Sequence, residues 1–389
     1  MYEPTGRQDP RLAFMWPAFA AASTSDFAAI LAKRFVNLAL GADQAPESRE
    51  PAWATPNTIA LELKCVRLHD FSTAEQGVAT LLCAPFALHR ATIADLAPGH
   101  SLVAALREAG LHRLFVTDWR SATPDMRLLG IDDYLAALNV LVDQLGGSVN
   151  LIGLCQGGWM SLLYAARFSA KVRKLVLVGA PIDIAAGQSA LSALADASPL
   201  ALFDELVKFG DGRVLGRKVL KFWGAETLQR HEIRDLLQTT EPIGSPAFAT
   251  LEATFRQWHV ATLDLPGTYY LEVIEKLYKR NAIAAGEFVA LGERIDLAKV
   301  RVPLFLLAAR DDELVAPAQL FAVECLVGTS ARDIRKALAP CNHGGLFMGR
   351  TILAEFWPRI ARWMIDAQHQ NLAPVSAYRA ACAARPGKR

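Results

Sequence analysis

The chain has 389 residues, 52% of them hydrophobic and 21% charged, so it is long enough to bury one large core that carries an insertion. Its formal net charge is only +2 at pH 7, and it has no basic stripe or recognisable nucleic-acid motif, which excludes nucleic acid as an expected partner. Its six cysteines include no CxxC pair, so we predict no metal site and no metal cofactor.

Residues 1–57 are expected to form a helical extension and a linker. Residues 12–22 are apolar, but they are few and contain Pro17, so we interpret them as mature sequence rather than a signal peptide and expect a cytoplasmic protein. Residues 23–41 place apolar side chains at helical spacing, and the Pro-containing stretch 45–56 follows. The apolar stripe needs cover, either from the protein's own core or from a second copy in a homodimer.

Residues 58–185 are expected to form the first part of an α/β core. Apolar or alternating runs at 59–68, 78–84 and 114–117 predict strands, and 131–145 predicts a crossover helix. Strands that alternate with helices indicate a mostly parallel sheet, whose ligand site lies beyond the carboxyl ends of the strands.

Residues 148–158 contain the most informative motif of the chain. A β-branched, apolar strand runs into Gly-Leu-Cys-Gln-Gly, which is a G-x-C-x-G box with Cys155 at the position of a hydrolase nucleophile. Gly153 and Gly157 leave room for a sharp turn from strand to helix, and a helix N-terminus favours thiolate. We therefore predict an α/β-hydrolase fold with Cys155 as the nucleophile of acyl transfer; the alternative is a structural cysteine in a Gly-rich turn.

The other two members of a catalytic triad are expected downstream, in the order acid and then histidine. The apolar strand 301–309 breaks at adjacent carboxylates, of which Asp312 is the predicted acid and Asp311 the runner-up. His343 stands among glycines after the last predicted strand, where it is free to reach the thiol, and is the predicted general base.

Acyl transfer also needs donors for the tetrahedral oxyanion. We expect one from the backbone N–H of Gln156 and another from the loop after the strand at 78–84, around Ala87.

Residues 186–298 are mainly helical in pattern, with no convincing strand, and are expected to form a cap over the site. Trp159, Trp258 and Tyr269 are predicted to contact the acyl group, although aromatic residues at such positions also serve simple packing. Residues 299–370 complete the core, and 371–389 are expected to form a disordered basic tail.

The chain resembles the superfamily of polyhydroxyalkanoate synthases and intracellular polyhydroxyalkanoate (PHB) depolymerases, which are cysteine α/β-hydrolases. The resemblance rests on Thr117-Asp-Trp-Arg, Gly130-Ile-Asp-Asp-Tyr-Leu, the box at 153–158, Asp264-Leu-Pro-Gly-Thr-Tyr-Tyr-Leu and His343-Gly-Gly-Leu-Phe-Met-Gly-Arg. It implies a triad of Cys155, Asp312 and His343, the residues already chosen.

The two branches are not separated by these motifs. Glu313 stands where synthases usually have histidine, and the C-terminal third looks closer to depolymerases, whereas Gly157 stands where depolymerases usually have proline. We expect an intracellular depolymerase-type esterase acting on a polyester or its hydroxyacyl oligomers.

Two alternatives remain open. One is a short-type synthase that takes hydroxyacyl groups from coenzyme A, which enters as a substrate thioester rather than a cofactor. The other is a non-catalytic protein bound to the polyester granule. The resemblance also makes the granule surface a candidate partner for residues 23–41.

Overall fold

The computed structural model describes residues 50–223 and 228–366. The predicted helix at 23–41, the apolar segment at 12–22 and the predicted tail at 371–389 lie outside the described residues. Predictions that concern them stay predictions.

An eight-stranded sheet forms the centre of the molecule, in the order β1-β2-β6-β3-β7-β8-β13-β14. Neighbouring strands in the run β6-β3-β7-β8-β13-β14 pair in parallel. The hairpin β1-β2 is antiparallel, and its strand β2 also pairs with β6 in antiparallel orientation. The strands are β1 (Thr58–Glu62), β2 (Val66–Asp70), β3 (Thr80–Cys83), β6 (Leu114–Trp119), β7 (Val149–Leu154), β8 (Val172–Val178), β13 (Leu304–Ala309) and β14 (Ile334–Ala339). The mostly parallel sheet confirms the predicted fold class, although the single strand expected at 59–68 is a hairpin.

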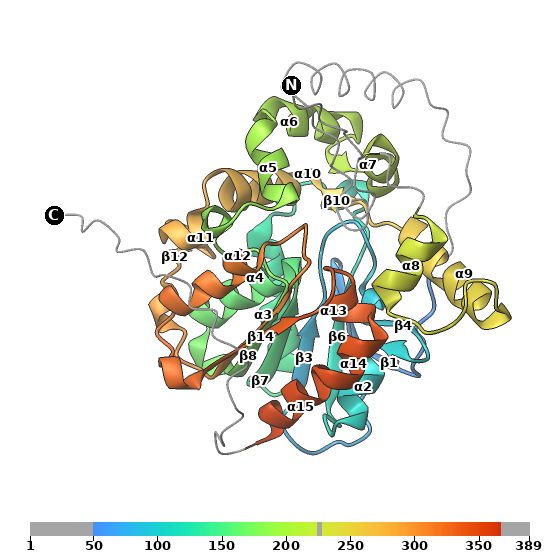
Figure 1. Ribbon diagram of the computed structural model, residues 1–389. Coiled ribbons are helices and arrows are strands. Elements are labelled where there is room, and N and C mark those ends of the chain that lie inside the picture. The colour runs from blue at the N-terminus through green and yellow to red at the C-terminus, as the bar shows by residue number, and fades with distance from the viewer. Residues whose placement is uncertain (1–49, 224–227, 367–389) are drawn as a thin grey trace, which may run out of the picture.

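Helices cover both faces of the sheet (Figure 1). On one face α2 (Leu102–Glu108), α14 (Arg350–Glu355) and α15 (Trp357–Ile365) pack against one another, and on the other α3 (Ile131–Gln144) packs against α4 (Gln156–Arg167). Because both faces are covered, the inner strands are apolar along their length rather than alternating, and every residue of β7 and β13 is buried.

Residues 186–298 extend in Figure 1 from the right-hand side across the top of the molecule to the left-hand side. They contain α5 (Ala190–Ala197), α6 (Leu200–Phe209), α7 (Gly216–Trp223), α8 (Arg230–Leu237), α9 (Pro246–Val260), α10 (Gly267–Glu272), a π-helix (Val273–Lys279) and α11 (Ala282–Ala285). The expectation that this region has no strand is wrong in detail. It holds two short antiparallel pairs, β9 (Arg213–Val214) with β10 (Leu265–Pro266) and β11 (Val289–Ala290) with β12 (Glu293–Arg294). Two-residue strands are too short to produce an alternating pattern in the sequence.

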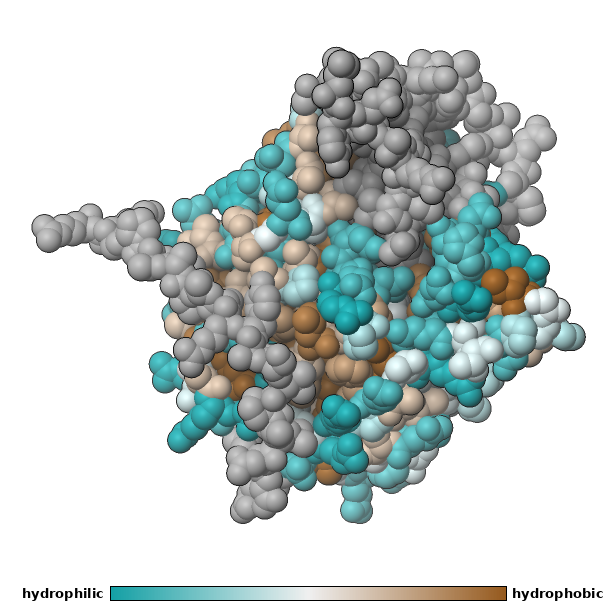
Figure 2. All heavy atoms as spheres, in the orientation of Figure 1, coloured by the Kyte–Doolittle hydropathy of each residue, from teal (hydrophilic) through white to brown (hydrophobic). Residues whose placement is uncertain are grey.

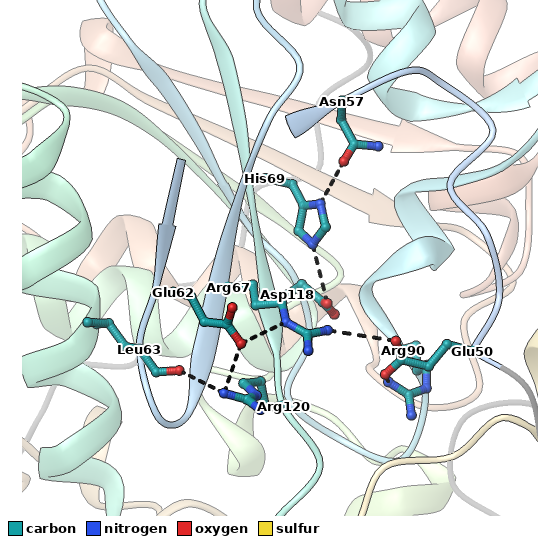
Figure 3. A network of polar contacts seen from close by, with 9 residues as sticks. All are labelled: Glu50, Asn57, Glu62, Leu63, Arg67, His69, Arg90, Asp118 and Arg120. Atoms are coloured by element: carbon teal, nitrogen blue, oxygen red, sulfur yellow. Dashed lines mark hydrogen bonds and ion pairs between the residues drawn. The ribbon is translucent and has the colours of Figure 1, made fainter. Parts of the chain in front are cut away.

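A polar network fastens the antiparallel hairpin to β6 (Figure 3). His69 of β2 lies between the Asn57 side chain, 2.7 Å from its Nδ1, and the Asp118 carboxylate, 3.4 Å from its Nε2. Glu62 of β1 pairs with both Arg67 and Arg120 at 3.2 and 3.1 Å. The network therefore holds the edge of the sheet on the side of Asp118.

The surface seen in Figure 2 is mainly hydrophilic on its right-hand side, and apolar residues form smaller areas toward the centre and left. Across residues 50–223 and 228–366, no helix combines the length and the apolar character that a bilayer span requires.

Glu272, at the end of α10, connects the cap to the core. Its carboxylate accepts a hydrogen bond from the backbone N–H of Ile131 at 2.7 Å, at the start of α3, and it also binds Lys276 at 2.6 Å. A Cβ atom at Gly130 would lie 2.7 Å from an oxygen of the same carboxylate, so a larger residue there would displace the Glu272 side chain. Glu272 thus binds the N-terminus of α3 from a distant segment of the chain, in the manner of a helix-capping residue.

We expect Glu272→Ala to lower the free energy of unfolding by about 1–2 kcal/mol, because it leaves an N-terminal helix donor without its acceptor. Urea unfolding followed by circular dichroism measures the change. The control is Glu205→Ala, which removes an exposed ion pair with Lys208 and is expected to leave the free energy of unfolding nearly unchanged. Equal effects of the two variants would contradict the proposed link.

Candidate active site

Cys155 stands on a sharp turn between β7 and α4. Its backbone has φ 47° and ψ −114°, a conformation that residues with a side chain rarely adopt. Its N–H donates to the carbonyl of Val178 on β8 at 2.8 Å, and its own carbonyl accepts from Gly158 at 2.9 Å, so the turn is tied to the sheet and to the helix. The sulfur lies at the N-terminus of a 12-residue helix, whose dipole favours thiolate.

The turn requires glycine on both sides of Cys155. A Cβ atom at Gly157 would lie 2.2 Å from the carbonyl oxygen of Cys83, and one at Gly153 would lie 2.6 Å from the Cα atom of Gly158. A Cβ atom at Gly158 would in turn meet the Ala180 side chain at 2.4 Å. The G-x-C-x-G spacing is therefore a consequence of backbone segments that approach one another closely.

His343 and Asp312 come together as predicted from their order in the chain. His343 follows β14, Asp312 follows β13, and His343 Nδ1 lies 2.7 Å from Asp312 Oδ2. The other carboxylate oxygen accepts from the N–H groups of Leu314 and Val315, at 3.0 and 2.9 Å. The carboxylate is thus held in one orientation, and it accepts its hydrogen bond from the proton on Nδ1 of the imidazole.

Asp311, the runner-up for the acid, points elsewhere. It is exposed and pairs with the guanidinium of Arg310 at 3.1 Å. The Asp312 side chain is only 1% exposed and that of His343 only 2%. The structure therefore assigns the histidine partner to Asp312 and gives Asp311 a surface ion pair.

The surroundings of His343 favour the charged imidazolium. Burial lowers its pKa, but the negative charges of Asp312 and Cys155, with the hydrogen bond to Asp312, outweigh burial and raise the pKa above its usual range. Its Nε2 atom is buried and has no hydrogen-bond partner within the described part of the chain. A thiol beside this nitrogen can lose its proton to the imidazole, which leaves a thiolate and imidazolium pair.

The loop expected to supply the second oxyanion donor is fixed by two side chains of β6. Thr117 accepts a hydrogen bond from the N–H of Ala84 at 2.9 Å, and the indole N–H of Trp119 donates to the Ala84 carbonyl at 2.8 Å. Both side chains lie on the same face of β6, and Asp118 faces the opposite side and binds His69. The Thr-Asp-Trp motif therefore anchors this loop, a role that the sequence had not revealed.

Ala87 itself lies in this loop and is 4% exposed. Its backbone N–H makes no hydrogen bond to any of the residues that the structure describes. The N–H of Gln156 belongs to the first turn of α4, where helix donors lack an intrahelical partner. Both donors are thus available in principle, and their role in catalysis stays a prediction.

The three aromatic residues predicted to bind the acyl group are all buried and each packs against the site from a different element. Trp159 in α4 donates its indole N–H to the Gln156 side chain at 2.5 Å. Trp258 in α9 stacks on His89 with ring centroids 4.8 Å apart, and so supports the end of the oxyanion loop. The hydroxyl of Tyr269 in α10 lies 3.4 Å from the carbonyl of Phe86 in that loop. These contacts are packing and support, and contact with substrate stays a prediction for all three.

Within the described segments, no group of three or more His, Cys, Asp or Glu residues is arranged to hold a metal ion. The site itself places a thiol next to a histidine that a buried carboxylate orients.

The strand order, the turn at Cys155 and the site beyond the carboxyl ends of the parallel strands define an α/β-hydrolase. These features of the fold carry the assignment. Among solved structures, similar folds include a monoacylglycerol lipase from Paleococcus ferrophilus, with 14% identity, 77% of this chain and 98% of that chain covered and a TM-score of 0.49. A bromoperoxidase from Bacillus anthracis has 15% identity, 80% and 99% coverage and the same TM-score of 0.49.

Sequence relatives narrow the class. The family model described as "PHB de-polymerase C-terminus" matches residues 234–368. A protein named poly(3-hydroxyalkanoate) polymerase subunit PhaC from Synechocystis sp. is 29% identical over 72% of this chain and 76% of its own length. Proteins of the same name are 25% identical in Haloferax mediterranei, over 80% of this chain and 64% of the relative, and 26% in Allochromatium vinosum, over 71% and 78%. The chain is thus similar, in its C-terminal third and over about three quarters of its length respectively, to a depolymerase family model and to polymerase subunits, which supports a place in the superfamily of polyhydroxyalkanoate synthases and depolymerases.

We expect Asp312→Asn to shift the pH dependence of thiol reactivity. Removal of the charge lowers the pKa of His343, the thiolate loses its cationic partner, and the midpoint of Cys155 alkylation moves to higher pH. Ester or thioester turnover should fall on the order of 10³- to 10⁴-fold. Iodoacetamide labelling of Cys155 between pH 5 and 9 measures the midpoint.

Asp311→Asn is the matched control, because the neighbouring carboxylate binds Arg310 at the surface. Its alkylation curve should overlay that of the wild type. An unchanged curve for Asp312→Asn would show that the buried carboxylate does not set the charge of His343.

A second prediction concerns the turn. We expect Gly157→Ala to abolish turnover and to destabilise the fold by about 1–3 kcal/mol, since its Cβ atom would collide with the Cys83 carbonyl. Thermal unfolding and an ester assay measure both effects. At Gly244 nothing lies within 4 Å of an added Cβ atom, so Gly244→Ala serves as control and should leave both values near those of the wild type.

Proposed function

We propose that this protein is a polyhydroxyalkanoate synthase-type acyltransferase that uses Cys155, His343 and Asp312. The observation that carries the proposal is the buried 2.7 Å bond between His343 and Asp312 next to a thiol at a helix N-terminus. The relatives are named poly(3-hydroxyalkanoate) polymerase subunits, which supports polymer formation, and the family resemblance implies a 3-hydroxyacyl thioester of coenzyme A as the substrate.

In the first half-reaction His343 takes the proton of Cys155, and the thiolate attacks the thioester carbonyl. The N–H of Gln156 and one from the loop around Ala87 stabilise the oxyanion. The bond between the carbonyl carbon and the sulfur of coenzyme A breaks, coenzyme A leaves with the proton from His343, and an acyl-cysteine remains. Asp312 holds the imidazole and stabilises its charged form throughout.

In the second half-reaction a 3-hydroxyl group of another acyl unit attacks the acyl-cysteine. His343 accepts the hydroxyl proton, a new ester bond forms, and the bond to Cys155 breaks with return of the proton to sulfur. Water in place of the hydroxyl would give hydrolysis instead. The acceptor thus decides between the two branches, and the chemistry of the thiol does not.

Two features support transfer over hydrolysis. The thiol residue is 5% exposed and His343 is 2% exposed, which limits the access of water to the acyl-cysteine. Gly157 occupies a space bounded by the Cys83 carbonyl, and a side chain such as the proline usual in depolymerases would not fit there without a backbone shift.

A depolymerase-type esterase, which we expected from the C-terminal third, is the second candidate. The match of residues 234–368 to the depolymerase C-terminal family model favours it. The relatives named polymerase subunits support the synthase alternative better than this first expectation. Attachment to a polyester granule and a cytoplasmic location are compatible with either candidate and form part of the proposal.

The test supplies purified protein with 3-hydroxybutyryl-CoA in one reaction and amorphous polyester in another. We expect release of coenzyme A, a 3-hydroxybutyryl adduct on the peptide that contains Cys155, and no soluble acids from the polyester. Cys155→Ala should lose both coenzyme A release and adduct. If the polyester yields soluble hydroxyacids and the thioester releases no coenzyme A, the synthase proposal is wrong and the protein is an esterase.

A further inference from the structure

We infer that Tyr278 is a positioning residue for acyl transfer, which anchors the Gln156 side chain and thereby aims the Gln156 backbone N–H at the carbonyl oxygen of the substrate. The inference rests on the proposed function insofar as it assumes that Cys155 becomes acylated. It does not depend on whether a hydroxyl or water accepts the acyl group.

The Gln156 side chain is held at both ends. Its Nε2 donates to the Tyr278 hydroxyl at 2.9 Å, and its Oε1 accepts from the indole N–H of Trp159 at 2.5 Å. An indole nitrogen can only donate, so the amide oxygen must face Trp159 and the amide nitrogen must face Tyr278. The tyrosine oxygen is therefore an acceptor in this chain of bonds, and no apolar ring can replace it.

These two hydrogen bonds of the Gln156 side chain matter because Gln156 directly follows Cys155. The N–H expected to bind the oxyanion belongs to the peptide that joins the two residues, so its direction depends on the backbone of both. Cys155 has φ 47°, and such a conformation persists only where its surroundings hold it. A side chain fixed at both amide atoms holds the second residue of that peptide in place.

Tyr278 comes from the cap and is itself well supported. It lies in the π-helix Val273–Lys279, a form of helix often found at functional sites. The adjacent Lys279 donates to the carbonyl groups of Asp196 and Ser198, at 3.1 and 2.7 Å. Two residues further on, Asn281 donates to the Asp183 carboxylate at 2.7 Å. The hydroxyl is thus presented to Gln156 from a segment fastened on both sides.

A residue that only filled space would have a different signature from one that orients an oxyanion donor. Alkylation of Cys155 by iodoacetamide requires an accessible thiolate but no oxyanion donor. Acylation by a thioester or an ester requires both. The ratio of the two rates at one sulfur atom therefore reports on the donor and is insensitive to loss of the thiolate.

The experiment compares full-length wild type with Tyr278→Phe. Mass spectrometry follows the acylation of Cys155 by 3-hydroxybutyryl-CoA and by p-nitrophenyl butyrate, and the alkylation of the same thiol by iodoacetamide. Removal of a whole oxyanion donor costs about 10²- to 10³-fold, so misalignment of one donor should slow both acylations roughly 10- to 100-fold. Alkylation should stay within about twofold of the wild type, as should the KM for the thioester.

Tyr164→Phe is the matched control. It removes a tyrosine hydroxyl from α4, the helix that begins at Gln156; this hydroxyl binds Asn139 at 3.2 Å, so its loss should leave all three rates unchanged. A second variant, Gln156→Met, removes the other partner of the bond but keeps the backbone N–H. It should slow acylation to a similar extent, and adding Tyr278→Phe to it should cause little further loss.

Acylation within about twofold of the wild type in Tyr278→Phe would overturn the inference, and so would a parallel fall of acylation and alkylation. Full additivity of the two substitutions would also overturn it. If wild-type Cys155 is acylated but forms no polymer, the proposed synthase function fails, and the ratio of acylation to alkylation still decides the role of Tyr278.

Discussion

The backbone at Cys155 is the constraint on which the rest of the site depends. A residue with a side chain adopts φ 47° there because β7 must end and α4 must begin within one residue. The turn exists only because Gly153, Gly157 and Gly158 let neighbouring backbone segments approach within distances that a Cβ atom would forbid. As a result, the thiol of Cys155 lies at the positive end of a helix dipole, where its charged form is favoured.

The parallel sheet then determines where the partners of this thiol can stand. Asp312 follows β13 and His343 follows β14, so both lie beyond the carboxyl ends of the parallel strands, as Cys155 does. Burial of His343 alone would lower its pKa, and the Asp312 carboxylate reverses that effect. Leu314 and Val315 supply the backbone donors that hold the buried carboxylate in position against the histidine.

The site and its scaffold could be predicted from the sequence to different depths. The candidate triad could be located because each of its members follows a strand, and strands of a buried parallel sheet are apolar over their whole length. The choice of Asp312 over Asp311 also agreed with the structure, since only the former faces the histidine. The side-chain contacts of Trp119, Gln156 and Tyr278 could not be predicted, because they join segments up to 122 residues apart. No local pattern encodes such a pairing.

The choice between synthase and depolymerase shows a different limit of sequence patterns. The same thiol, histidine and carboxylate serve both reactions, and the difference lies in which oxygen nucleophile reaches the acyl-cysteine. We expect that property to depend on the shape of the predicted cap, residues 186–298, which packs on the core through long-range contacts. Motifs around the triad therefore identify the covalent step well and the acceptor poorly.

The aromatic rings around Phe86 have a consequence for the evolution of this molecule. Phe86 comes from the oxyanion loop, Trp119 from the sheet, Tyr134 from a core helix and Tyr269 from the cap, and neighbouring centroids lie 4.5 to 5.8 Å apart. One packing unit thus contains parts of the scaffold, the loop and the cap. If the cap were replaced by that of a distant relative, the new cap would lack an aromatic ring matched to Phe86, Trp119 and Tyr134. Acceptor specificity is therefore expected to change by substitutions within an existing cap more readily than by exchange of whole caps.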